Sequence, residues 1–184
     1  IEEEAGRLNR FVSNLFEMTR IEAGMVRARR DPLDIAAAIN AAVSRARRLH
    51  PQLQVDVSLA DRLPLASGDP VMLEQVLFNL LDNARKYAGT APVTIYARGE
   101  GNDVSIAVTD QGKGLPEGDL ERIFEKFYRR SKGDGRQAGT GLGLAIARGL
   151  VTAMGGTIKA ESPALRRRGT RFIIRLPRVG EGEA

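Results

Sequence analysis

The sequence has 184 residues, no cysteine, a single histidine, and only 5% aromatic residues. Without cysteine there can be neither a disulfide framework nor a thiolate metal site, a composition that suits a reducing cytoplasm. No apolar stretch is long enough to span a bilayer, and no signal peptide is visible. The hydrophobic content of 42% is nevertheless sufficient for the core of one domain plus an appendage.

The net charge of +5 does not indicate nucleic-acid binding. Basic residues are scattered along the chain, with short runs at 29–30, 47–48 and 166–168. Nucleic-acid modules usually combine a concentrated basic face with stacking aromatic residues, which are scarce here. We therefore interpret the charge as an arginine-rich solvated surface and expect no nucleic-acid partner.

Helical and strand patterns interleave along the chain without an internal repeat. Helices are expected over residues 1–24, 33–49, 70–88, 120–124 and 141–154. Strands are expected over residues 53–59, 93–98, 104–110, 156–160 and 170–176. Residues 25–32 have the character of a basic linker, and residues 131–138 have the polar composition of a mobile loop. This order predicts an α/β two-layer sandwich with a mixed sheet packed on helices.

The first helix carries an apolar stripe at Leu8, Phe11, Leu15 and Met18 that follows a heptad pattern. Such a stripe is typical of a helix that packs against another helix, although an amphipathic surface helix would show it too. No neighbouring segment supplies a partner, so the partner is either missing or belongs to another molecule. Because the chain begins at Ile1 inside this pattern, we expect it to be a fragment of a longer protein.

Polar side chains gather on one face of the helix expected over residues 70–88. Asn79 and Asn83 lie one turn apart, and Lys86 follows near the same face. Amides among the surrounding leucines and valines are costly unless they form hydrogen bonds. These groups could hold a metal ion and phosphates, or the amides could only brace the backbone.

Two glycine motifs follow this helix. Asp110 ends a strand and precedes Gly112 and Gly114, which allow a tight turn and a close approach to a flat ring, although Asp110 could also simply form an Asx turn. A second loop opens a helix, where backbone N–H groups can hold phosphate oxygens; it comprises Gly139, Thr140, Gly141, Leu142, Gly143 and Leu144. This loop lacks the spacing of a dinucleotide fold and the Lys-Ser/Thr of a P-loop.

The order and spacing of these motifs, with Phe124, Phe127 and Arg129 between them, resemble the catalytic and ATP-binding domain of a bacterial sensor histidine kinase. The resemblance extends from residue 1 to about Pro177 and implies the Bergerat (GHKL) type of sandwich. Residues 79–89, 115–118 and 123–129 are most similar to the potassium-transport (Kdp) sensor kinases.

The resemblance implies ATP and Mg²⁺ as cofactors and gives each motif a role. Asn83 would bind Mg²⁺ with Asn79 beside it, and Lys86 would neutralise phosphate charge. Asp110 would accept a hydrogen bond from the adenine amino group, supported through water by Thr170. Tyr87 would pack near the adenine or ribose, Phe124 and Phe127 would anchor a lid structurally, and Arg129 would reach the γ-phosphate.

Hydrolytic relatives of the gyrase type use a glutamate one turn before the metal-binding asparagine. That position is Asn79, an amide that cannot act as a general base. Phosphoryl transfer to a separate acceptor is therefore favoured, and a hydrolytic ATPase or a non-catalytic nucleotide-binding scaffold remain the alternatives. The histidine of the chain, His50, lacks the acidic neighbour of the family's phosphoacceptor motif, so we expect it to be a surface residue at a helix end.

The resemblance also implies an organisation and partners. Residues 1–24 would be the second helix of a dimerisation hairpin, 25–32 a linker, 33–178 the catalytic domain and 179–184 a tail. The partners would be the histidine-bearing helix of the same parent kinase, a cognate response regulator and a second copy in a parent homodimer. The parent would be anchored in the bacterial inner membrane with this domain in the cytoplasm.

Overall fold

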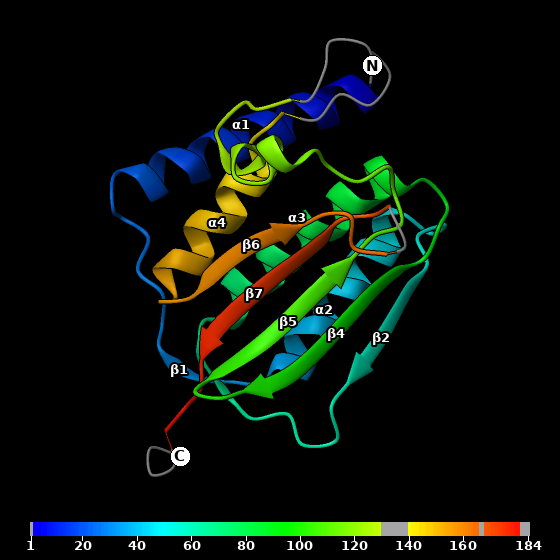
Figure 1. Ribbon diagram of the computed structural model, residues 1–184. Helices are drawn as coiled ribbons and strands as arrows, with labels where there is room; N and C mark the ends of the chain where they lie inside the picture. The colour runs from blue at the N-terminus through cyan, green and yellow to red at the C-terminus, as the bar shows by residue number, and fades with distance from the viewer. Residues whose placement is uncertain (1, 130–139, 166–167, 181–184) are drawn as a thin grey trace.

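A mixed five-stranded sheet forms one layer of the structure (Figure 1). The computed structural model describes residues 2–129, 140–165 and 168–180. The strands lie in the order β2 (Val55–Leu59), β4 (Val93–Glu100), β5 (Asp103–Thr109), β7 (Arg171–Pro177) and β6 (Thr157–Glu161). β2 runs parallel to β4, and the other neighbours are antiparallel. Alternate residues of β4 and β7 are buried, so one face of the sheet is apolar.

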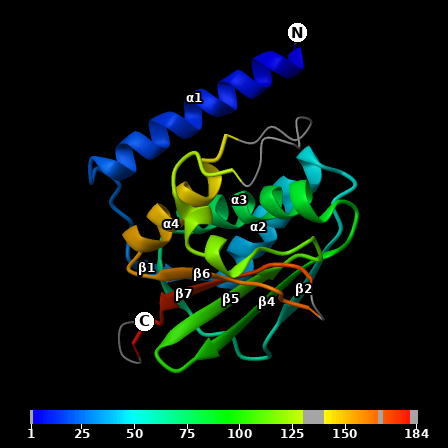
Figure 2. The ribbon, with the colours of Figure 1, turned by 45° about the horizontal axis from the view of Figure 1, so that its top comes forward.

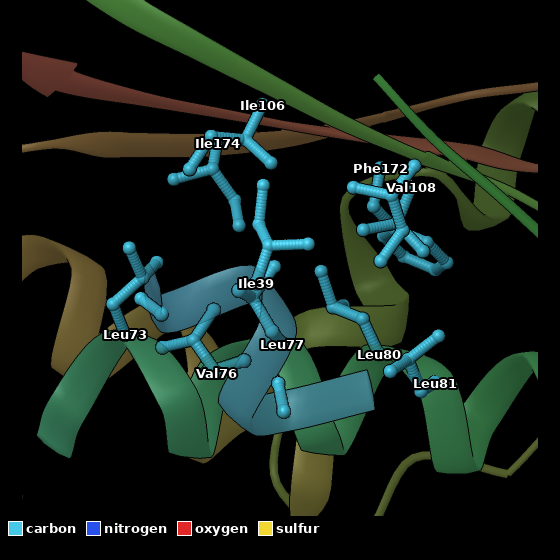
Figure 3. Packing of buried hydrophobic residues seen from close by; sticks show 14 of the residues in the cluster. Ile39, Leu73, Val76, Leu77, Leu80, Leu81, Ile106, Val108, Phe172 and Ile174 are labelled. Carbon is cyan, nitrogen blue, oxygen red and sulfur yellow. The ribbon is translucent and has the colours of Figure 1, made fainter. Parts of the chain in front are cut away.

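Three helices cover this apolar face: α2 (Ile35–Leu49), α3 (Pro70–Ala88) and α4 (Gly143–Ala153). Figure 3 shows the core between the two layers, where Leu77 and Leu80 of α3 face Ile106 and Ile174 of the sheet. All four side chains are fully buried, and each contributes about 1.5–3 kcal/mol through removal of apolar surface from water. The predicted α/β two-layer sandwich is therefore confirmed.

The bounds of α3 agree with the sequence prediction because the signals at its start are local. Asp69 is the N-cap, and its Oδ1 accepts hydrogen bonds from the N–H groups of Val71 at 2.9 Å and Met72 at 3.3 Å. Pro70 occupies the first helical turn, and Gly89 follows the last residue with a positive φ of 66°. The helix that carries the predicted polar face is therefore fixed at both ends.

Some predicted bounds are wrong. Residues 31–33 form a short strand, β1 (Asp31–Leu33), antiparallel to β3 (Ala66–Gly68), where linker and helix were predicted. α2 begins later because Asp34 is its N-cap and accepts a hydrogen bond from the N–H of Ala37 at 3.0 Å. Two 3₁₀ turns, η1 (Glu117–Asp119) and η2 (Arg122–Phe124), replace one helix, and α4 begins at Gly143. The loop predicted at 131–138 lies outside the described residues.

The N-terminal helix α1 (Glu2–Glu22) lies beside α4 (Figure 2). Ile21, near its end, contacts Gly149 of α4 so closely that an added Cβ there would lie 2.6 Å from Ile21. Met18 and Ile21 pack against the core, whereas Leu8 and Phe16 are 64% and 68% exposed. The predicted stripe is thus divided: its C-terminal end packs on this domain, and its N-terminal part faces solvent. None of the described helices is long and apolar enough to cross a membrane.

Candidate active site

The candidate site lies along the C-terminal half of α3, which the start of α4 contacts at Asn79 and the loop after β5 contacts at Tyr87. The loop rests directly on the end of α3, because a Cβ at Gly112 would lie only 2.7 Å from the backbone oxygen of Tyr87. Gly114 has a φ of +73°, and a Cβ there would lie 2.6 Å from Ser162 Oγ. The tight turn was predicted, but the close approaches of both glycines seen here are to protein atoms.

Asp110 is buried in this loop, with 3% of its surface exposed. Its Oδ1 accepts hydrogen bonds from the N–H groups of Gly112 at 2.8 Å and Thr170 at 3.1 Å. Burial raises the pKa of this carboxyl above its ordinary value, although the two N–H groups oppose the shift by stabilising the charged form. The bond to Gly112 is the Asx turn considered as an alternative, and it uses only one carboxylate oxygen.

The segment before β7 holds the Asp110 loop in place. The backbone N–H of Asp110 donates to the carbonyl of Thr170 at 2.9 Å, and that of Gly169 donates to the carbonyl of Gly112 at 2.8 Å. Ser162 Oγ accepts from the N–H of Leu115 at 2.7 Å and donates to the carbonyl of Gly169 at 3.0 Å. Thr170 therefore supports Asp110 directly through its backbone. Sequence reasoning missed Ser162, since no local pattern indicates this long-range contact.

The two asparagines of α3 differ in their contacts. Asn79 Oδ1 accepts a hydrogen bond from Gln75 Nε2 at 3.1 Å, and Asn79 Nδ2 donates to the carbonyl of Gly143 at 3.1 Å. This second bond ties α3 to the first residue of α4. Asn83 is half-buried and forms no side-chain hydrogen bond within the described ranges, so its oxygen is available to a ligand.

Lys86 is held by a residue that sequence reasoning missed. Its Nζ lies 2.5 Å from Asp82 Oδ2, and Arg85 Nη2 lies 3.0 Å from Asp82 Oδ1. Burial alone would raise the pKa of Asp82, but Lys86 and Arg85 outweigh it, so that the pKa lies below its ordinary value. The spacing i, i+4 was the available signal for this ion pair.

His50 also contacts Asp82, at 3.5 Å between Nε2 and Oδ1. It lies at the C-cap of α2, as expected, but it is half-buried rather than a free surface residue. Burial, followed by the charge of Arg85, lowers the pKa of His50 below its ordinary value, although Asp82 opposes the shift. The surroundings of His50 therefore favour the neutral imidazole.

The loop that opens α4 is described from Thr140 onward, and Gly139 lies outside the described residues. Thr140 Oγ1 accepts from the N–H of Leu142 at 3.3 Å, and Leu142 is fully buried. Gly141 has a φ of +71°, where an added Cβ would lie 2.8 Å from Phe127 Cα. The first backbone N–H groups of a helix, here those of Gly143 and Leu144, have no intrahelical acceptor and can bind an anion.

The remaining predicted residues surround these elements. Phe124 is a core residue, 5% exposed, with its ring edge-on to Phe172 at a centroid distance of 6.2 Å. Phe127 is 56% exposed; its N–H donates to the carbonyl of Gly141 at 3.0 Å, so its anchoring contact is made by the backbone. Tyr87 is 55% exposed, and Arg129 is exposed as well.

The available ligands determine which metal the site could hold. The described residues contain no group of three or more His, Cys, Asp or Glu side chains that could hold a metal ion. A cation here would instead use amide oxygens, water and phosphate oxygens, a ligand set that suits Mg²⁺.

Comparison with known proteins places this site in a family. The family model described as "Histidine kinase-, DNA gyrase B-, and HSP90-like ATPase" matches residues 68–180. The chain belongs to this family. It is 40% identical to the Sensor protein KdpD of Escherichia coli (strain K12), over 82% of this chain and 17% of that protein. It is 38% identical to the signal transduction histidine-protein kinase AfsQ2 of Streptomyces coelicolor, over 95% of this chain and 31% of that protein.

A solved structure shares the fold of this chain. Full-length ShkA in complex with AMPPNP matches with a TM-score of 0.81 and 28% identity, over 96% of this chain and 37% of that one. The chain is therefore an ATP-binding catalytic domain of the sensor histidine kinase type, and the predicted resemblance to these kinases, those of the Kdp type included, is confirmed. Its match spans only 17% and 31% of the lengths of the two curated relatives.

Proposed function

We propose that this domain binds ATP with Mg²⁺ and transfers the γ-phosphoryl group to a histidine on a dimerisation helix of its parent kinase. One observation carries the proposal: the C-terminal half of α3, which bears the amides, contacts both the start of α4 and the Asp110 loop. Asn79 is bonded to Gly143 at 3.1 Å, and Gly112 lies against the backbone of Tyr87. A phosphate-binding helix start and a buried base-reading carboxylate thus flank the C-terminal half of the same helix.

On the phosphate side, Asn83 is the proposed Mg²⁺ ligand, with Asn79 next to it. The half-buried Asn83 amide has no other side-chain hydrogen bond within the described ranges, which supports this role. A bound Mg²⁺ would neutralise phosphate charge. Lys86, oriented by Asp82, would add a second positive charge at the phosphates, and Arg129 would reach the γ-phosphate. The phosphate loop would comprise Gly139, Thr140, Gly141, Leu142, Gly143 and Leu144.

On the base side, Asp110 is the proposed reader of adenine. Its Oδ1 is engaged by two backbone N–H groups, while Oδ2 has no hydrogen-bond partner within the described ranges. Since an ionised carboxylate only accepts hydrogen bonds, it would favour the adenine amino group over the guanine carbonyl. Gly112 and Gly114 would shape this loop, Thr170 would hold the carboxylate, and the exposed Tyr87 would cover the adenine or ribose.

Hydrolysis of ATP is the disfavoured alternative. Asn79 stands where a hydrolytic relative would place its glutamate base, and its side-chain oxygen is occupied by Gln75 at 3.1 Å. A scaffold without catalysis is disfavoured because the polar groups for metal, base and phosphate are all present. Transfer would therefore depend on positioning and charge neutralisation of the phosphates.

We further propose an organisation for the parent protein. Residues 1–24 would be the second helix of the dimerisation hairpin, 25–32 a linker, 33–178 the catalytic domain and 179–184 a tail. The parent would dimerise, relay its phosphate to an aspartate of a response regulator, respond to potassium, and be anchored in the inner membrane with this domain in the cytoplasm. The KdpD relative supports the proposed stimulus.

Isothermal titration with ATP and Mg²⁺ tests the proposed metal ligand. Asn83→Asp adds a carboxylate that alters the metal geometry and repels phosphate, so we expect affinity to fall at least about tenfold, or ~1.4 kcal/mol. Asn102→Asp, the same change in the exposed turn between β4 and β5, serves as the control and should bind as the wild type does. Equal affinities for wild type and Asn83→Asp would refute the assignment.

A further inference from the structure

A chain of side-chain hydrogen bonds joins α2, α3 and the start of α4. Arg45 Nη1 of α2 donates to Gln75 Oε1 at 3.0 Å, and Gln75 Nε2 donates to Asn79 Oδ1 at 3.1 Å. Asn79 Nδ2 then donates to the carbonyl of Gly143 at 3.1 Å. The two ends of this chain of hydrogen bonds, Arg45 and Gly143, lie far apart in the sequence, so local sequence patterns do not indicate it.

The direction of the bonds in this chain is set from both ends, because Arg45 only donates and the Gly143 carbonyl only accepts. A guanidinium group only donates hydrogen bonds, so the oxygen of the Gln75 amide must face it. The Gln75 nitrogen then faces Asn79, whose oxygen must turn toward Gln75. That leaves the Asn79 nitrogen for the Gly143 carbonyl, an acceptor, so all three contacts are satisfied at once.

Arg45 is itself held from other sides. Its Nη1 lies 3.5 Å from Glu74 Oε1, and its guanidinium carbon lies 4.3 Å from the centre of the Phe78 ring. The ion-pair and cation–π contacts restrict the guanidinium beside Gln75. Arg45 therefore orients the Gln75 amide so that its nitrogen faces Asn79.

We propose that Gln75, oriented by Arg45, is a positioning residue that fixes the Asn79 amide and thereby holds the phosphate-binding start of α4 against α3. This inference rests on the proposed nucleotide site. The Asn79 amide in the reverse orientation would present its oxygen to the Gly143 carbonyl, and the two acceptors would repel each other. Gln75 therefore acts on the phosphate side of the site, one turn from Asn79, and forms no hydrogen bond with Asp110.

Two substitutions of Gln75 distinguish orientation from simple bracing or charge. Gln75→Glu still accepts a hydrogen bond from Arg45 but cannot donate one to Asn79. It therefore removes the bond that orients the Asn79 amide and retains the contact with α2. Gln75→Met has a similar volume and no charge, and removes both bonds. We expect each variant to bind MgATP about fivefold more weakly, the factor for loss of the one hydrogen bond that both variants lack, from Gln75 to Asn79.

The readouts are titrations of the full chain with MgATP and with adenosine, together with thermal unfolding of the nucleotide-free protein. We expect adenosine affinity to be unchanged in both variants, and the unfolding temperature of Gln75→Glu to match the wild type.

Wild-type MgATP affinity in Gln75→Glu would overturn the proposal. Loss in Gln75→Glu but not in Gln75→Met would assign the effect to charge and overturn it too. Equally weakened binding of adenosine and of MgATP would show that Gln75 only supports the fold, and would overturn the proposal. Failure of the wild type to bind MgATP would instead refute the proposed function.

Discussion

The two carboxylate oxygens of Asp110 have different surroundings. Oδ1 is bound by the N–H groups of Gly112 and Thr170, whereas Oδ2 has no partner in the part of the chain that the structure describes. Burial of the charged group raises its pKa, which means that ionisation is disfavoured in the folded state. A buried carboxyl group with a pKa shifted in this way is typical of a functional site.

This asymmetry predicts opposite effects of Asp110→Asn on stability and binding. The amide oxygen can keep both backbone N–H bonds, while the amide nitrogen replaces Oδ2 and opposes the adenine amino group. At pH 7 we expect the variant to be at least as stable as the wild type, with weaker ATP binding and no preference for adenine over guanine. Urea unfolding and titration with ATP and GTP measure these effects.

The pH dependence of stability gives an independent check on the same variant. Because the folded-state pKa is raised, the stabilising contribution of Asp110 is fully present below its ordinary pKa and is lost as pH rises through the folded-state value. The stability difference between variant and wild type should therefore shrink as the pH is lowered. Retained adenine selectivity, or a clear loss of stability at pH 7, would show that Asp110 is misassigned.

At the scale of elements, local signals in the sequence sufficed where an element's ends are fixed by its own residues. α3 was predicted from Asp69, Pro70 and its apolar period, and its observed bounds agree. β1 and β3 were missed because each has three residues and their pairing is specified by contacts across more than thirty positions of the chain. A three-residue strand carries too little alternation to be recognised.

The candidate site was predictable to a similar extent. Its polar residues form short motifs, so Asn79, Asn83 and Asp110 could be selected from the sequence. Their supports could not, because Ser162 contacts Leu115 and Gly169 only through the fold. Gln75 was likewise missed, since its importance depends on Arg45 of another helix.

The contact between the Asp110 loop and α3 can be tested with one methyl group. In Gly112→Ala the added Cβ would lie 2.7 Å from the Tyr87 oxygen, and both groups belong to the backbone. We expect a loss of about 1–3 kcal/mol in the free energy of unfolding, as for overpacking, and weaker ATP binding. Gly118→Ala, with nothing within 4 Å of its added Cβ, is the control and should change stability by less than about 0.5 kcal/mol. Equal unfolding curves for the two variants would mean that the loop does not need this contact.

At the scale of the whole molecule, α1 has two different surfaces along its length. Its end is attached to the domain by Ile21 on Gly149 and by an ion pair between Glu22 and Lys126. Farther toward the N-terminus, Phe11 and Leu15 are 37% and 43% exposed, which leaves part of the apolar stripe in contact with solvent. An exposed apolar stripe of this kind is typical of a helix that packs against another helix. This division supports the proposed dimerisation role of residues 1–24.

The single histidine of the chain leads to the last prediction. His50 is half-buried and lies 3.5 Å from Asp82, on α2 rather than on the proposed hairpin helix. We therefore expect no self-labelling of this chain by γ-labelled ATP. A separately supplied hairpin of the parent kinase should accept the label, because it brings the missing histidine and covers the apolar stripe of α1. Transfer should be slow, since the high effective concentration that a covalent tether provides is lost. A hairpin with its histidine replaced by glutamine is the matched control and should stay unlabelled. Acid-labile phosphate on His50 would contradict this account of where the reaction occurs.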